Sequence, residues 1–439
     1  MYSLRPSEST VGRCEDRGSR EARVRLFSAL SALPVALASC TAWAGTTLVL
    51  ESWRDDDRIV WEEVIAPAFG AAHPGIGLEF RPTAPVDYDA ALASRLEAGE
   101  AGDLIACRPF DASLALYGDG HLADLGGLAG LARFPAAAKR PWQTDDGSAT
   151  FCVPVASVIH GFVYNRDAFR ELGIGPPETE AEFFAALERI REDGARVPLA
   201  MGVRDRWEAA VLGYDNIGPA YWKGEEGRRA LIGGRQKLTD GPWVAPFRML
   251  AKWRRYLGDG YRARGYRDSR DLFAWGRAAV YPAGSWEIAG LRKSRPGFAM
   301  GAFRPPVPRA GDACHISDHL DMGIGLNAAS PHGEAARVFL DWLGSAEFAS
   351  LLADALPGFY PLSDHAAEPD DPLARAFVSW RDDCRSTIRF AAQYLSRGTP
   401  DLGRAVWDAA VDAITGAATA EEIGARLQAG LESRHVPRR

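Results

Sequence analysis

The sequence predicts an α/β protein with two lobes, each built on a mostly parallel sheet flanked by helices. Three observations support this fold class. The 439 residues exceed what one hydrophobic core usually organises. Short β-rich runs alternate with amphipathic helices, which is the rhythm of an open parallel sheet. No Pro/Ser-rich linker separates two complete halves, and this favours lobes that are joined by several chain crossings.

The alternation begins near Thr46. Residues Thr46 to Ser52 form a β-rich run, and Asp55, Asp56 and Asp57 are expected to cap the helix that follows, because carboxylates satisfy free amides at a helix start. Residues 61–72 carry one apolar stripe, and residues 76–80 alternate as the next strand. Further strands are expected at 103–107, 158–164, 198–202, 278–281 and 322–327, and helices at 88–96, 112–117, 180–192, 246–255, 334–343 and 346–352.

Composition and charge exclude several classes of protein. Apolar residues make up 47% of the chain and charged residues 25%, and no apolar run of about 18 residues follows the N-terminal region, which excludes a multi-span membrane protein. The formal net charge of -7 argues against a nucleic-acid partner. No motif for a cofactor is present, and none is expected to bind.

Residues 1–44 read as a secretory leader. Arg20, Arg23 and Arg25 precede the apolar stretch Leu26 to Ala38, and Ala42-Trp43-Ala44 has the small-residue pattern of a cleavage site. Cleavage after Ala44 would release a soluble periplasmic protein, and the start of the first strand at Thr46 favours this. The alternative is a lipid anchor on Cys40, because Leu37-Ala38-Ser39-Cys40 resembles a bacterial lipoprotein box.

Three blocks resemble the extracellular solute-binding proteins of sugar importers, the maltose-binding-protein-like family with the type II periplasmic-binding fold. Residues 151–190 contain a Pro-bearing strand, the turn Tyr164-Asn165-Arg166-Asp167 and a Gly-Ile-x-x-Pro-x-Thr loop; residues 276–286 end in Gly-Ser-Trp; and residues 323–342 match a strand and the helix after it. The resemblance implies one lobe from 46–153 plus 320–355 and another from 157–313 plus 358–439, with hinge crossings between them.

The same resemblance implies a function. It predicts a monomeric binding protein, not an enzyme, that holds a mono- or oligosaccharide between its lobes and passes it to the permease subunits of an ABC importer. Two alternatives stay open. One is an exported hydrolase that uses loop carboxylates such as Asp55, Asp57 and Asp111; the other is a binder of a non-sugar polar ligand, such as a polyamine.

Loops that follow strands supply the candidate ligand-binding residues, because ligands bind outside the carboxyl ends of strands in such sheets. A sugar site needs flat aromatic side chains and groups that hydrogen-bond hydroxyls. Trp286 of Gly-Ser-Trp is the first candidate, and residues 213–224 are expected to form an aromatic-rich loop at the site. The full set is Trp53, Arg108, Asp111, Asn216, Trp222, Trp286, Asp318, His319, Phe359, Tyr360 and Arg397.

His315, Asp318, His319 and Asp321 form the one group that suggests a metal. They precede a β pattern, in which alternate side chains face opposite ways, so sugar contacts or hinge hydrogen bonds are expected instead of a metal site.

Four cysteines follow the leader. They allow three pairings, and if the lobes divide as above, pairing Cys107 with Cys152 and Cys314 with Cys384 keeps each disulfide within one lobe, so this pairing ranks first; four buried free thiols are the alternative.

Overall fold

The computed structural model describes residues 45–365, 368–399 and 401–435. The predicted signal peptide and both of its processing alternatives, including Cys40, lie outside these ranges. No helix in the described ranges has the length and apolar character needed to cross a bilayer.

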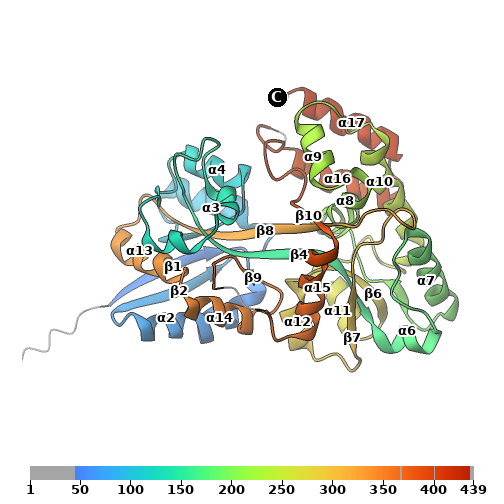
Figure 1. Cartoon of the computed structure of the whole chain (residues 1–439), viewed down its shortest axis with the longest axis horizontal. Helices are drawn as coiled ribbons and strands as arrows, with labels where there is room; N and C mark the ends of the chain where they lie inside the picture. Colours follow the sequence, from blue (N-terminus) through green and yellow to red (C-terminus); the bar gives the residue numbers. More distant parts are fainter. Residues whose placement is uncertain (1–44, 366–367, 400, 436–439) are drawn as a thin grey trace, which may run out of the picture. The chain divides into compact units, whose positions relative to one another are not determined.

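Two lobes share one mixed sheet of strands and are covered by helices (Figure 1). The strands are β1 Thr46–Ser52, β2 Ile76–Pro82, β3 Leu104–Cys107, β4 Val153–Asn165, β5 Val197–Leu199, β6 Ala278–Gly284, β7 Met300–Phe303, β8 His315–Leu326, β9 Tyr360–Pro361 and β10 Arg385–Thr387.

The helices continue the alternation between the strands. They are α1 Arg58–Val60, α2 Ala66–Ala72, α3 Tyr88–Ala98, α4 Asp111–Gly118, α5 Ala136–Lys139, α6 Arg166–Leu172, α7 Glu180–Asp193, α8 Asp215–Trp222, α9 Glu225–Ile232, α10 Gly241–Trp253, α11 Tyr266–Ala274, α12 Glu287–Ser294, α13 Gly333–Trp342, α14 Ala346–Ala355, α15 Pro372–Asp383, α16 Leu402–Thr415 and α17 Ala420–Glu432.

Each strand and helix that the sequence predicts overlaps an observed one, with two differences. β8 begins at His315 instead of Met322. Residues 213–224 are not a loop, because a π-helical turn at Ala209–Tyr214 leads directly into α8. Every residue of α8 except Tyr221 is buried, so this segment forms part of the core of the second lobe.

The strand order is β2-β1-β3-β8-β4-β6-β5. β1 is parallel to β2 and β3, and β5 is parallel to β6, as expected. The sheet as a whole is mixed, because the two long strands β4 and β8 run antiparallel to each other and to β6 and β3 respectively. Connections through helices produce the parallel pairs, whereas the strands that pass between the lobes reverse direction.

β4 and β8 lie side by side between the two groups of helices in Figure 1 and belong to both lobes. β4 pairs with β8 over Val153–Ile159 and then with β6 over His160–Tyr164. β8 pairs with β10 at its start and with β3 at its end. β9 joins them by pairing with Ala156 and Ser157, where the register of β4 is irregular.

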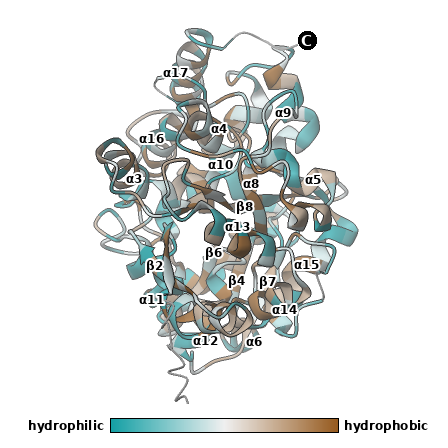
Figure 2. Ribbon diagram, turned by 90° about the vertical axis from the view of Figure 1, so that its left-hand side faces the viewer, coloured by the Kyte–Doolittle hydropathy of each residue, from teal (hydrophilic) through white to brown (hydrophobic). Residues whose placement is uncertain are grey.

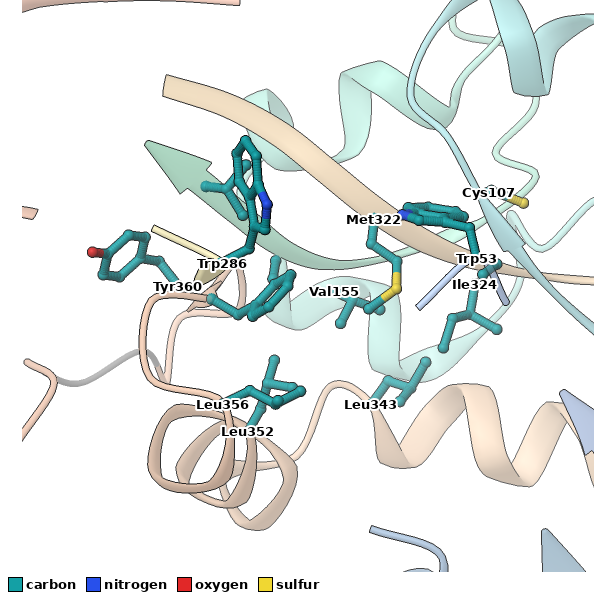
Figure 3. Close-up of a cluster of buried hydrophobic side chains, with 14 of the residues drawn as sticks. Trp53, Cys107, Val155, Trp286, Met322, Ile324, Leu343, Leu352, Leu356 and Tyr360 are labelled. Atoms are coloured by element: carbon teal, nitrogen blue, oxygen red, sulfur yellow. The ribbon is translucent and has the colours of Figure 1, made fainter. Parts of the chain in front are cut away.

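β4 and the part of β8 from Met322 to Leu326 are largely apolar and are buried. All 13 residues of β4 are buried, and Figure 2 shows hydrophobic colouring along parts of β4 and β8. Figure 3 draws Val155 and Met322 of these strands together with Leu352 of α14 and Leu356, which follows that helix, within one continuous core cluster. Burial on both faces explains why these strands read as apolar runs instead of alternating patterns.

The second lobe has a further core that is rich in aromatic rings. Trp222 stacks on Trp243 with their centroids 4.5 Å apart, and Tyr214 stacks on Phe247 at 4.1 Å. Helix α7 contributes Phe183, Leu187 and Ile190 from the stripe that the sequence shows.

The structure joins Cys107 to Cys152 and Cys314 to Cys384, the pairing ranked first from the sequence. Cys314 lies directly before β8 and Cys384 directly before β10. The second disulfide therefore lies at the start of the parallel β8–β10 pair.

We expect replacement of both Cys314 and Cys384 by Ser to lower the free energy of unfolding by about 2–4 kcal/mol, because the unfolded chain loses a cross-link over 70 residues. Urea unfolding measures this change. Peptide mapping of the unreduced wild-type chain should yield one peptide that contains Cys314 and Cys384 and another that contains Cys107 and Cys152. Alkylation of any of these four thiols without reductant would contradict the assignment.

Candidate ligand-binding site

A cavity of about 670 Å³ lies at the carboxyl ends of strands, where the sequence analysis placed the site. Trp53 follows β1, Arg108 follows β3 and Trp286 follows β6, while His319 and Asp321 lie on β8. Further parts of the wall come from α4, from Trp207 and the π-helical turn after it, from the segment 389–399 after β10 and from α16. The cavity is therefore lined by elements of both lobes, and its volume suits a small polar molecule.

The Gly-Ser-Trp turn places Trp286. The Ser285 hydroxyl accepts a hydrogen bond from Ile159 N at 3.0 Å and donates one to Gly358 O, so it joins β4 to the chain before β9. The indole of Trp286 folds back over Gly284, where a Cβ would lie 1.8 Å from the ring. Gly358 has φ +97° and passes against Ser285 O, and both conditions require glycine.

Three ion pairs, made by two arginines, close one side of the cavity. Arg397 Nε donates to Asp111 Oδ1 at 2.8 Å, and its terminal nitrogens donate to the Asp145 carboxylate at 2.8 Å. Arg404 pairs with Asp89 at 3.1 Å. Asp111 and Arg397, both predicted to contact ligand, thus contact each other and connect α4 with the segment before α16.

Three tryptophan rings at the cavity are each covered by a guanidinium. Arg108 lies 4.6 Å from the centroid of Trp53, Arg389 lies 5.6 Å from that of Trp286, and Arg404 lies 4.1 Å from that of Trp407. Trp53 and Trp286 are only 5% and 7% exposed, so their faces are largely occupied by protein. These contacts stabilise the charges by cation–π attraction.

Trp207 is more accessible than Trp53 and Trp286. It is half-buried in the wall of the cavity, and the centroid of its ring lies 4.8 Å from that of Tyr266. No described guanidinium lies over it. Trp207 is therefore the aromatic side chain that is best placed to cover the apolar face of a ligand.

The run Asp55-Asp56-Asp57 is not a cap, which corrects the sequence prediction. None of these carboxylates accepts a hydrogen bond as a cap, and each pairs with an arginine: Asp57 with Arg54, Asp56 with Arg270 and Asp55 with Arg267. The charge of an arginine nearby outweighs the weaker attraction of a short helical turn. Asp56 also lines the cavity.

Six of the predicted binding residues line the cavity: Trp53, Arg108, Asp111, Trp286, His319 and Arg397. Asn216 and Trp222 do not, because they face the core of the second lobe. Asn216 Nδ2 donates to Gly161 O at 2.8 Å, and Trp222 is 2% exposed.

Asp318, Phe359 and Tyr360 also lie outside the cavity wall. Asp318 makes a two-point ion pair with Arg381, on the opposite face of β8 from His319. Tyr360 donates its hydroxyl hydrogen to Ala374 O at 2.8 Å, and Phe359 is 2% exposed beneath Arg54. These three side chains hold the chain crossings together.

The histidines near β8 gather no metal-ligating set. Among the residues that the structure describes, no group of three or more His, Cys, Asp or Glu side chains could hold a metal ion. Burial holds the pKa of His319 well below its usual range, and the Arg389 charge lowers it further. His319 is therefore a neutral hydrogen-bonding group in the cavity wall.

Sequence reasoning missed Asp56, Trp207, Asp321, Arg389 and Trp407 as cavity residues. Trp207 follows β5 and could have been found by the rule that found Trp53. Asp321 belongs to the group of His315, Asp318, His319 and Asp321, which the sequence suggested as a metal site. Arg389 and Trp407 lie in the helical C-terminal part, where no local pattern indicates which side chains return to the cavity.

The protein belongs to the bacterial extracellular solute-binding protein family, whose sequence model matches residues 56–349. This is a family of binding proteins. One curated relative is a multiple sugar-binding protein of Streptococcus mutans, 23% identical over 45% of this chain and 47% of that protein. Another is an uncharacterized ABC transporter extracellular-binding protein of Pyrococcus horikoshii, 25% identical over 49% of this chain and 47% of that protein. The match spans about half the length of these relatives.

Solved structures confirm the fold. A chitin oligosaccharide binding protein superposes with a TM-score of 0.76 at 21% identity, covering 89% of this chain and 98% of that one. The solute receptor AcbH, described as preferring β-D-galactopyranose, gives 0.77 at 17% identity, over 89% and 99% of the two chains. RafE in complex with raffinose gives 0.73 at 21% identity, over 88% and 99%. The chain thus has the two-lobe type II binding-protein fold.

Three carboxyl groups at or beneath the cavity are buried with unsatisfied oxygens. Burial raises the pKa of Glu208 to about 8 and the pKa values of Asp215 and Glu287 to about 7. At least one carboxyl oxygen of each has no partner among the described residues. These groups are protonated, in whole or in part, at neutral pH.

The free energy of unfolding should therefore fall as the pH rises from about 6.5 to 8. A carboxyl with a raised folded-state pKa stabilises the folded protein while both states are protonated, and it loses that contribution as pH rises through the folded-state pKa. His160 and His319 have lowered pKa values, so they do not make the free energy of unfolding depend on pH above about pH 6.5. Urea unfolding across this range should show a loss on the order of 1 kcal/mol for Glu208 alone.

In the Glu208→Gln variant, the free energy of unfolding should fall less steeply with pH, because this variant removes the carboxyl group with the highest of the three raised pKa values. Glu63→Gln, which changes an exposed carboxyl, is the matched control and should keep the wild-type slope. An unchanged slope in Glu208→Gln would contradict the assignment.

Proposed function

We propose that the protein captures a mono- or oligosaccharide in this cavity and delivers it to the transmembrane permease subunits of an ABC importer. The observation that carries the proposal is the combination, in one cavity, of an accessible indole at Trp207 with several guanidinium and carboxylate groups. Sugars present weakly apolar faces and hydroxyl edges, and this wall offers a partner for each. The sugar-binding descriptions of several relatives support the same assignment.

The two alternatives find less support in the cavity. Asp55, Asp57 and Asp111, the carboxylates considered for a hydrolase, are each held by an arginine. For a polyamine, the wall would need an excess of negative charge, but five arginines accompany its six aspartates.

The proposal includes the setting in which the protein acts. It works as a monomer in the periplasm after cleavage at Ala44, with the lipid-anchored form through Cys40 as the alternative. The lobes are 46–153 plus 320–355 and 157–313 plus 358–439. The pairing of β4 with β8 and β9 supports hinge positions at the ends of these segments.

A sugar panel tests the proposal. One or more mono- or oligosaccharides should raise the melting temperature, since a ligand at 100 times its Kd adds about 2.7 kcal/mol to the free energy of unfolding. If polyamines raise the melting temperature and no sugar does, the proposal fails. Incubation with glycosides, followed by an assay for released product, distinguishes binding from hydrolysis.

Trp207→Ala should weaken sugar binding about tenfold, because it removes the accessible ring from the cavity wall. Titration calorimetry measures the change. Trp275→Ala is the matched control: Trp275 is 65% exposed and lies outside the cavity, so its removal should leave Kd unchanged. Equal effects of the two substitutions would argue against Trp207 as a ligand contact.

A further inference from the structure

Arg389 occupies an unusual position in the cavity wall. Its guanidinium lies over Trp286, and its Nε donates to His160 Nε2 at 3.3 Å. His160 Nδ1 lies 3.1 Å from Val211 O, and this contact fixes the orientation of the imidazole. The side chain of Arg389 is 20% exposed, and the cavity is the space that it faces.

The terminal nitrogens of Arg389 lack hydrogen-bond partners. Among the described residues, neither Nη1 nor Nη2 makes a hydrogen bond, and the nearest carboxylate, Asp321, lies 3.5 Å from Nη2. Asp215 is also close, but burial raises its pKa to about 7, so it supplies only part of a negative charge at neutral pH. The guanidinium of Arg389 is therefore ion-paired with Asp321, but both of its terminal nitrogens can still donate hydrogen bonds to a group in the cavity.

Arg108 brings a second positive charge to the same region. It stands over Trp53 and donates to Asp89 from Nε at 2.9 Å, while its Nη1 has no hydrogen-bond partner in the described chain. Burial lowers the pKa of Arg389, the nearby Asp321 and Asp215 raise it in part, and the charge of Arg108 lowers it. His319 lies within the influence of both arginines and is neutral, so it does not offset their charge.

We propose that the sugar bound in this cavity is acidic, with a uronic acid residue whose carboxylate is held by Nη1 and Nη2 of Arg389 and faced by Arg108. This inference rests on the proposed function and specifies its substrate class. A planar carboxylate matches a guanidinium fork at two points and is ionised at neutral pH. A neutral hydroxyl accepts from the fork at a single point, whereas a carboxylate accepts from both terminal nitrogens in one plane.

The carboxylate is preferred to a phosphate ester because of the acids nearby. Asp56, Asp321 and Asp215 line the same wall and would repel a group that carries close to two negative charges. A group with a single negative charge meets less repulsion from these carboxylates than a phosphate ester does.

Titration calorimetry of the full chain with matched sugar pairs tests the inference. The pairs are galacturonate with galactose, glucuronate with glucose, and the corresponding di- and trisaccharides. We expect the acidic member of at least one pair to bind roughly tenfold to a hundredfold more tightly than its neutral partner. Its affinity should also fall as salt is raised.

Arg389→Gln should remove most of this preference, measured as the ratio of the Kd values for the neutral and the acidic member of the pair. Arg389→Lys keeps the positive charge but loses the two-point geometry of the guanidinium, so it should keep part of the preference for the acidic sugar. Arg277→Gln is the matched control, because Arg277 is exposed beside Trp275 and lies outside the cavity.

The outcomes separate this inference from the proposed function. If the neutral member binds wild-type protein as tightly as its acidic partner in every pair that binds, or if a sugar phosphate binds and no uronate does, the acidic-sugar inference is wrong and sugar capture stands. If no sugar of either kind binds, the proposed function itself fails. The comparison of pairs on the wild-type chain remains decisive even if Arg389→Gln lowers the melting temperature.

Discussion

The antiparallel pairing of β4 with β8 is the constraint on which the rest of the structure depends. Each strand is paired at one end with the sheet of one lobe and at the other end with the sheet of the other. β9 adds a third crossing at the irregular part of β4, and Ser285 ties this crossing to the Gly-Ser-Trp turn. The hydrogen bonds that join the lobes therefore also fix the positions of the cavity walls.

This arrangement couples the cavity to the crossings. His319 and Asp321 lie on β8 itself, and Trp286 follows a strand that pairs with β4. A rotation about the crossings would move Trp286 relative to Trp53 and Arg108 on the other lobe. The residues beside the crossings that face away from the cavity, such as Asp318 with Arg381, have a structural role because they hold the strands and helix α15 together.

Arginine is the residue that organises the chemistry of the cavity. A guanidinium can stack on an indole and donate in its plane at the same time, so Arg108, Arg389 and Arg404 can each use a tryptophan face as support. This explains why tryptophans that follow strands are buried although they line a cavity. Their role is to position positive charge, and Trp207 is left as the accessible ring.

The sequence by itself determined the α/β class, the positions of nearly all helices and strands, and the family, because these depend on local periodicity and on short motifs. It also placed Trp53, Arg108 and Trp286 at the cavity, since side chains that follow parallel strands meet at one edge of the sheet. Tertiary structure alone decided that Asn216 and Trp222 face a core, that the three aspartates after β1 pair with arginines, and that Arg389 and Trp407 return to the site. The reason is physical: these outcomes depend on contacts between segments far apart in the chain, and no local pattern records which partner each side chain will meet.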